Sequence, residues 1–80
     1  MQPIAINMDK DINRIKVVLA DKKRTNKWLA EQLGKDPATV SKWCTNSCQP
    51  TLETLMKIAN LLEVSLNDLV RFKETSNSAV

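Results

Sequence analysis

The one glycine of the chain, Gly34, lies between two short segments that both favour helix, and this arrangement constrains the fold more than any other feature. The segment before it carries an apolar stripe at helical spacing, formed by Leu29, Ala30 and Leu33. A glycine after such a stripe commonly ends the helix in a left-handed conformation. Asp36 and Pro37 follow, a capping acid and then a residue that suits the first helical position. The sequence therefore predicts helices over 26–33 and 37–45, joined by a tight turn.

Two longer apolar stripes predict helices on either side of this pair. The first helix is expected over 12–22, after Asp11, with an inward stripe of Ile12, Ile15, Val18 and Leu19. The other is expected over 52–62, introduced by Pro50 and Thr51, with inward residues Leu52, Leu55, Ile58, Ala59 and Leu62.

Capping residues predict the remaining boundaries. Ser65 and Asp68 have the spacing of a capping box, which starts a helix over 66–72. Thr25 is the expected N-cap of the helix over 26–33. Asn46 is expected to take a positive φ after the next helix, because Asn tolerates that conformation best among residues with a side chain.

Composition agrees with an all-α fold. The chain has one Gly, three Pro, one Phe and no Tyr, so turn residues and sheet-favouring aromatics are both scarce. Its 80 residues suffice for one domain. We expect an N-terminal arm over 1–11, in which Ile4 and Ile6 alternate, then a five-helix domain over 12–72 and a tail over 73–80.

Charge is distributed unevenly along the chain. The net charge is +3, but residues 10–42 contain nine basic and four acidic side chains, a net of +5. Residues 43–80 have a net charge of −1. The basic half predicts a positive face for an anionic partner such as nucleic acid. The alternative is that these lysines are solvated on the outer surfaces of helices.

Several functional classes lack the residues they require. Two Cys and no His cannot supply the four ligands of a tetrahedral zinc site, so we predict neither a metal nor another cofactor. No apolar run is long enough to span a membrane, and the first residues lack the features of a secretory signal. We therefore expect a cytoplasmic protein with reduced thiols. No catalytic constellation is present, so we do not expect an enzyme.

Three runs of sequence together resemble the phage-repressor and Cro-like helix-turn-helix family, which includes regulators of the xenobiotic-response-element type. They are Trp28-Leu29-Ala30-Glu31-Gln32-Leu33-Gly34, Ala38-Thr39-Val40-Ser41-Lys42-Trp43 and Pro50-Thr51-Leu52-Glu53-Thr54-Leu55. The resemblance covers about residues 12–71. It implies a lambda-repressor-like domain of five helices whose third helix enters the major groove of double-stranded DNA.

Helical geometry selects the residues that would read DNA bases. At 100° per residue, Val40, Trp43 and Cys44 share one side of the third helix, and small or polar residues share the other. The expected base-reading residues are Pro37, Ala38, Thr39, Ser41 and Lys42. None of them is an Arg, Asn or Gln, so DNA shape is expected to contribute to specificity. The resemblance implies phosphate contacts from Asn26, Lys27, Thr45, Asn46 and Ser47.

These features predict a transcriptional regulator, expected to be a repressor that acts as a homodimer. One helix reads few base pairs, so two half-sites about 34 Å apart are expected. The expected dimer surface consists of Leu66, Leu69 and Phe72. The alternative is a protein-interaction module that keeps the fold without DNA binding.

Three further residues are ambiguous in the sequence. Trp28 lies off the apolar stripe, so it either packs on lysine stems or donates its indole N–H to a phosphate. The resemblance implies an Arg–Glu pair where this chain has Leu19 and Cys44, and we predict that these two residues touch. The alternative for Cys44 is a redox switch with Cys48.

Overall fold

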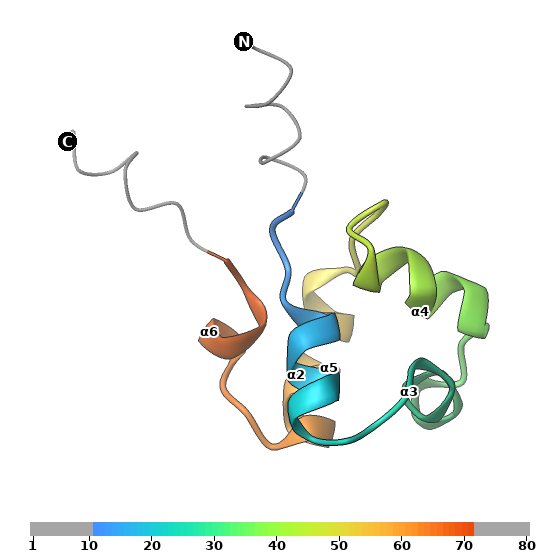
Figure 1. Ribbon diagram of the computed structural model, residues 1–80, viewed down its shortest axis with the longest axis horizontal. Helices are drawn as coiled ribbons and strands as arrows, with labels where there is room; N and C mark the ends of the chain where they lie inside the picture. The colour runs from blue at the N-terminus through green and yellow to red at the C-terminus, as the bar shows by residue number, and fades with distance from the viewer. Residues whose placement is uncertain (1–10, 72–80) are drawn as a thin grey trace, which may run out of the picture.

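The computed structural model describes residues 11–71 as an all-α domain of five helices (Figure 1). The helices are α2 (Ile15–Asp21), α3 (Asn26–Leu33), α4 (Pro37–Cys44), α5 (Leu52–Leu62) and α6 (Leu66–Leu69). The paired α3 and α4 lie at one end of the domain and α6 lies at the other (Figure 1). Within this part of the chain, no helix is long and apolar enough to cross a membrane.

The predicted N-caps of α3 and α4 are confirmed. The Thr25 hydroxyl accepts from the backbone N–H of Trp28 at 3.0 Å, and the Asp36 carboxylate accepts from that of Ala38 at 3.0 Å. Each bond satisfies one of the amides that the first turn of a helix leaves without a partner. The capping box before α6 is also present, because the Asp68 carboxylate accepts from the Ser65 amide at 3.1 Å.

Four helices end in the same way, with a residue at positive φ. These residues are Lys23, Gly34, Asn46 and Glu63. After α3, the Gly34 amide donates to the Glu31 carbonyl and the Lys35 amide donates to the Ala30 carbonyl, which is the Schellman arrangement. The predicted left-handed conformations of Gly34 and Asn46 are confirmed, with φ of 67° and 62°. No local pattern predicts the same conformation at Lys23 and Glu63.

The first helix begins at Ile15, so the prediction of a start at residue 12 is wrong. The backbone of Asn13 forms an antiparallel bridge with Val70 instead. The Arg14 amide donates to the Leu69 carbonyl at 2.9 Å, and the Arg71 amide donates to the Ile12 carbonyl at 2.7 Å. These bonds compete with the helix for the same backbone groups, and Ile12 is left outside it.

The same bridge shortens the last helix. We predicted residues 66–72, but α6 ends at Leu69 and Val70 is extended, with φ −120° and ψ 140°. Capping-box chemistry located the start of this helix correctly. Its end depends on a strand partner almost sixty residues earlier in the chain, which local periodicity does not reveal.

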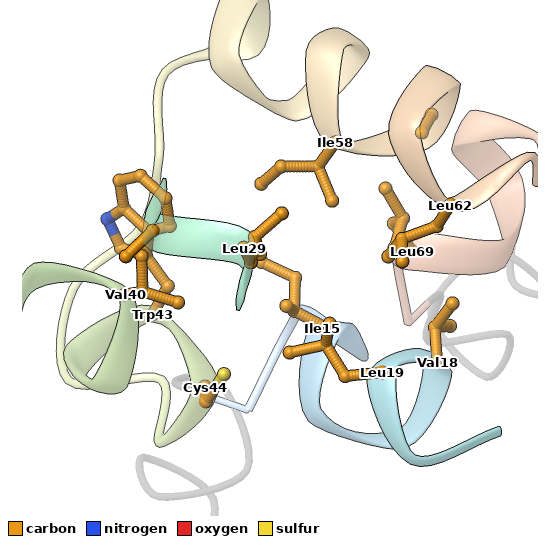
Figure 2. Packing of buried hydrophobic residues seen from close by; sticks show 12 residues of the cluster. Ile15, Val18, Leu19, Leu29, Val40, Trp43, Cys44, Ile58, Leu62 and Leu69 are labelled. Atoms are coloured by element: carbon orange, nitrogen blue, oxygen red, sulfur yellow. The ribbon is translucent and has the colours of Figure 1, made fainter. Parts of the chain in front are cut away.

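Figure 2 shows the buried apolar cluster that joins the five helices. Its members are Ile15, Val18, Leu19, Leu29, Ala30, Val40, Trp43, Cys44, Ile58, Ala59, Leu62 and Leu69. Most of the predicted inward residues of α5 are confirmed, but Leu52 is wrong because its side chain is 65% exposed. Leu52 is the first residue of the helix, and no other element within residues 11–71 covers its side chain.

Replacing Gly34 by Ala tests the left-handed turn between α3 and α4. A Cβ built there meets no atom within 4 Å, so the cost comes from the positive φ and not from a clash. We expect Gly34→Ala to lower the free energy of unfolding by about 1 kcal/mol, and Gly34→Asn to lower it by less. Urea denaturation followed by circular dichroism measures both. Gln32→Ala, on an exposed helical site, is the control, and an equal loss there would contradict the explanation.

Candidate nucleic-acid interface

The helix pair α3–α4 forms a helix-turn-helix, and hydrogen bonds fix both ends of its turn. The Schellman bonds end α3 at Leu33, and the Asp36 cap starts α4 with Pro37 as its first residue. Ala30 is 1% exposed and Val40 is fully buried, as predicted for two helices that pack against one another. The short turn and this contact fix the direction of α4 relative to α3.

The two faces of α4 have the predicted division. Val40, Trp43 and Cys44 are buried, whereas the opposite face is open to solvent. Of the expected base-reading residues, Thr39 is half-buried and the others are exposed, namely Pro37, Ala38, Ser41 and Lys42. The structure therefore exposes four of the five on a helix that is anchored from its other side, and Thr39 lies at the edge of the buried face.

The first turn of α3 contributes to the same region. Lys27 is exposed, and Asn26 is half-buried with its side-chain oxygen accepting from the Cys44 thiol at 3.3 Å. Within residues 11–71, no acceptor is found for the backbone N–H groups of Asn26 and Lys27. Unpaired amides at a helix N-terminus carry partial positive charge and favour an anion.

Asn46 has a different role from the phosphate contact expected for it. Its side chain is buried and takes part in five hydrogen bonds with the chain itself. Both donors of the amide group are used, so no donor remains for a phosphate. By contrast, Thr45 and Ser47 are exposed, and their hydroxyls bond one another at 2.9 Å.

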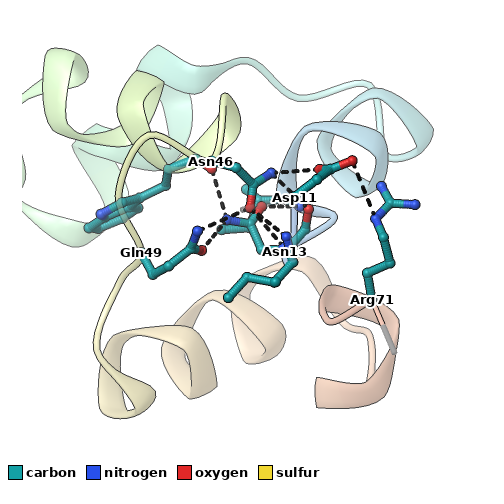
Figure 3. A network of polar contacts seen from close by, with 8 residues as sticks. Asp11, Asn13, Asn46, Gln49 and Arg71 are labelled. Atoms are coloured by element: carbon teal, nitrogen blue, oxygen red, sulfur yellow. Dashed lines mark hydrogen bonds and ion pairs between the residues drawn. The ribbon is translucent and has the colours of Figure 1, made fainter. Parts of the chain in front are cut away.

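Figure 3 shows the network around Asn46. The Asn46 side-chain oxygen accepts from the amides of Ile12 and Asn13 at 3.0 and 2.9 Å, and from the Gln49 side chain at 3.1 Å. Its amide nitrogen donates to the Asp11 carboxylate at 3.0 Å and to the Asn13 carbonyl at 3.2 Å. We call the side chains of Asn13, Asn46 and Gln49 the amide clip.

The amide clip also holds the last turn of α4. The Asn13 side chain donates to the Trp43 carbonyl at 2.8 Å and to the Gln49 side chain at 2.7 Å. Its oxygen accepts from the Ile15 amide at 3.0 Å, which caps the start of α2. Asn13 and Asn46 thus join the N-terminal end of α2, the C-terminal end of α4 and the loop after α4. The residue type of Asn46 predicted its positive φ, but no pattern in the sequence indicated these hydrogen-bond partners.

The residues expected at a dimer surface have three different positions. Leu69 is fully buried in the core of its own subunit, so its side chain is not available to a second copy. Leu66 is half-buried at the start of α6. Phe72 lies outside the described residues.

The two cysteines differ in exposure, and neither forms a disulfide. Cys44 is buried and Cys48 is exposed. Burial raises the pKa of the Cys44 thiol, and the positive charge of Lys16 opposes this only in part. Leu19 and Cys44 belong to the same cluster, although their direct contact stays a prediction. Within the described residues, no group of three His, Cys, Asp or Glu side chains could hold a metal ion.

Trp28 packs within the protein, as one of its two interpretations required. It is half-buried against the core, and the guanidinium of Arg24 lies over its ring, 4.4 Å from the ring centre. The packing partner is thus an arginine guanidinium and not the lysine stem that we expected. A cation over an indole face is an attractive arrangement.

A helix-turn-helix with an exposed second helix defines a class of DNA-binding domain, and the comparisons agree with this. Residues 14–75 match the family described as the Cro/C1-type HTH DNA-binding domain. The chain belongs to that family. It is also similar to the crystal structure of a proposed DNA-binding protein from Bacteroides fragilis, with 57% identity and a TM-score of 0.74. That match covers 75% of this chain and 97% of the other. No curated protein matches this chain.

Replacing Asn46 by Gly tests the amide clip separately from the backbone conformation. Glycine suits the positive φ, so any loss of stability reports the side-chain bonds. We expect Asn46→Gly to lower the free energy of unfolding by about 3 kcal/mol, because it leaves the buried amide of Asn13 and the part-buried amide of Ile12 without their acceptor. Chemical denaturation provides the measurement. Ser47→Gly is the control, and we expect a loss of less than about 1 kcal/mol. Equal losses would show that the clip contributes little.

Thiol labelling tests the environments of the cysteines. A water-soluble aromatic disulfide reagent at neutral pH should modify Cys48 rapidly in the native protein and Cys44 only slowly. Because the pKa of Cys44 is raised, its labelling should accelerate as the pH increases. Cys48→Ser should remove the fast phase and leave the slow one. Rapid labelling of both thiols in the folded protein would contradict the burial of Cys44.

Proposed function

We propose that this protein is a sequence-specific regulator of transcription that binds double-stranded DNA through α4. The observation that carries the proposal is the exposed face of α4 beside the unpaired amides at the start of α3. In the docking geometry of this motif, α4 lies in the major groove and its N-terminal residues meet base edges. The amides of Asn26 and Lys27 then face a phosphate.

Each exposed residue has a chemical role in this complex. Lys42 donates to the O6 and N7 acceptors of guanine, and Ala38 or the Thr39 methyl contacts the methyl group of thymine. Pro37 and Ser41 complete the reading face. Lys27, Thr45 and Ser47 bind phosphates together with Asn26 and set the register of the protein on the duplex. Asn46 has no part in this set, because the amide clip occupies its side chain.

We further propose that the protein acts as a homodimeric repressor in the cytoplasm. Two copies on a palindromic site double the number of base contacts, which a face without bidentate readers requires for a specific address. A domain seated in the major groove of a promoter excludes other proteins from it, so repression needs no further activity. Selection of bound sequences from random duplexes tests these points together, since a palindrome with half-sites about 34 Å apart is expected.

Salt dependence of DNA binding tests the phosphate contacts. We expect Lys42→Ala and Lys27→Ala each to reduce the slope of log affinity against log salt by about one unit, because each removes one cation from the interface. Lys22→Ala, on an exposed site at the C-terminal end of α2, is the matched control and should leave the slope unchanged. Fluorescence anisotropy with a labelled duplex measures all three. A wild-type affinity that does not depend on salt would indicate the protein-interaction module instead.

A further inference from the structure

An open apolar groove lies between the extended segment at Ile12 and the first turn of α5. Its volume is about 310 Å³, and its lining residues are Ile12, Asn13, Gln49, Pro50, Leu52, Leu55 and Val70. Ile12 is 40% exposed and Leu52 is 65% exposed. A single exposed leucine needs no explanation, but several apolar side chains around one hollow indicate an interaction site.

The apolar surface continues along α5. Met56 is 54% exposed and follows Leu52 by one helical turn, so the two side chains lie on the same face. Beyond Met56 a second hollow of about 300 Å³ is lined by Val64 and Leu66 among others. We call the combined surface the α5 face, and its apolar residues are Ile12, Leu52, Leu55, Met56, Leu66 and Val70.

We infer that the α5 face binds the α5 face of a second copy of this chain, and that this contact is the dimer interface. The inference rests on the homodimer of the proposed function and specifies its surface. It retains Leu66 from the sequence prediction, and replaces the buried Leu69 by Leu52 and Met56.

The charges around the α5 face favour a second copy as the occupant. Glu53 and Lys57 are exposed and lie one turn apart on α5, so a two-fold axis between two α5 helices lets each Glu53 approach Lys57 of the other copy. Asp11 and Arg71 form an ion pair, 3.6 Å apart, at the other rim of the groove. Charges of both signs make this surface compatible with itself. The basic half of the chain, which forms α2 to α4, would repel its own copy.

The position of the α5 face also leaves the reading residues free. Gln49 and Pro50 line the groove and directly follow the loop after α4. A second copy therefore sits beside the C-terminal end of α4 and does not cover its N-terminal half, where Pro37, Ala38 and Ser41 are exposed. The contact and DNA binding can occur together.

Sedimentation equilibrium of charge-bearing variants tests the inference. Leu52→Glu and Met56→Glu each place a carboxylate in the centre of the contact, and we expect each to raise the dimer Kd at least about a hundredfold. Both sites are exposed in one copy, and circular dichroism confirms that the variants stay folded. Val17→Glu is the matched control, because Val17 is 46% exposed on α2, and it should leave the dimer Kd unchanged. Wild-type self-association in L52E and M56E would overturn the inference, as would equal dissociation of V17E.

Charge exchange tests the two-fold arrangement. Glu53→Lys and Lys57→Glu should each weaken the dimer, and the double variant E53K/K57E should restore it. A wild-type protein that stays monomeric would overturn the inference, as would a monomer in which residues 1–10 shield Leu52 from solvent.

DNA binding is measured separately, on one duplex with the selected palindrome and one with a single half-site. If L52E binds the half-site like wild type but loses affinity for the palindrome, the interface is supported. If the dimer forms but neither duplex binds, the proposed function fails and the interface stands.

Discussion

The fold depends on the hydrogen bonds that the buried side chain of Asn46 forms. This amide is buried, so each of its polar groups needs a partner, and five hydrogen bonds supply them. The partners come from the segment before α2 and from Gln49, segments more than thirty residues apart in the sequence. A buried amide with all its bonds made specifies one arrangement, because any displacement leaves a donor or acceptor unpaired. The end of α4 is therefore fixed to the start of α2 by these bonds as well as by the core.

A second constraint is the scarcity of glycine. Four helices end in Schellman turns, and only one of them has glycine at the left-handed position. Asn46 adopts this conformation at low cost, but Lys23 and Glu63 do not have that advantage. Their strain, on the order of 1 kcal/mol each, is offset by the bonds that the turn provides to the terminal carbonyls. The Arg24 amide bonds Leu19 after α2, and the Val64 amide bonds Ala59 after α5.

The sequence predicted best where the physics is local. Thr25, Asp36 and Ser65 mark helix starts through bonds to residues two or three positions away, and all three starts were predicted correctly. The two errors at the outer ends of the domain have one cause, the bridge between Asn13 and Val70. No local pattern indicates that bridge, because its partners lie far apart in the chain.

At the candidate site too, the sequence predicted the local geometry of a helix but not the contacts between distant segments. The helical period alone placed Ala38, Ser41 and Lys42 on the outer face of α4, since Val40 and Trp43 are the only large apolar residues of that helix. The family resemblance assigned Asn46 to a phosphate, and it could not reveal the buried partners that occupy this amide. Leu52 was assigned to the core because its spacing fits the stripe, but a stripe does not reveal whether another element covers its first turn.

The amide clip also bears on how a weak reading face can be specific. The carbonyl of Lys42 accepts from the Thr45 hydroxyl and the Ser47 amide, and the next carbonyl, of Trp43, accepts from Asn13. The backbone that carries the Lys42 side chain is therefore held on both sides before any ligand arrives. Binding loses less conformational entropy when the contact residues are already ordered, so more of each interaction remains as affinity. In the proposed complex, the Lys42 side chain on this rigid last turn can discriminate more than the same side chain on a helix end that frays.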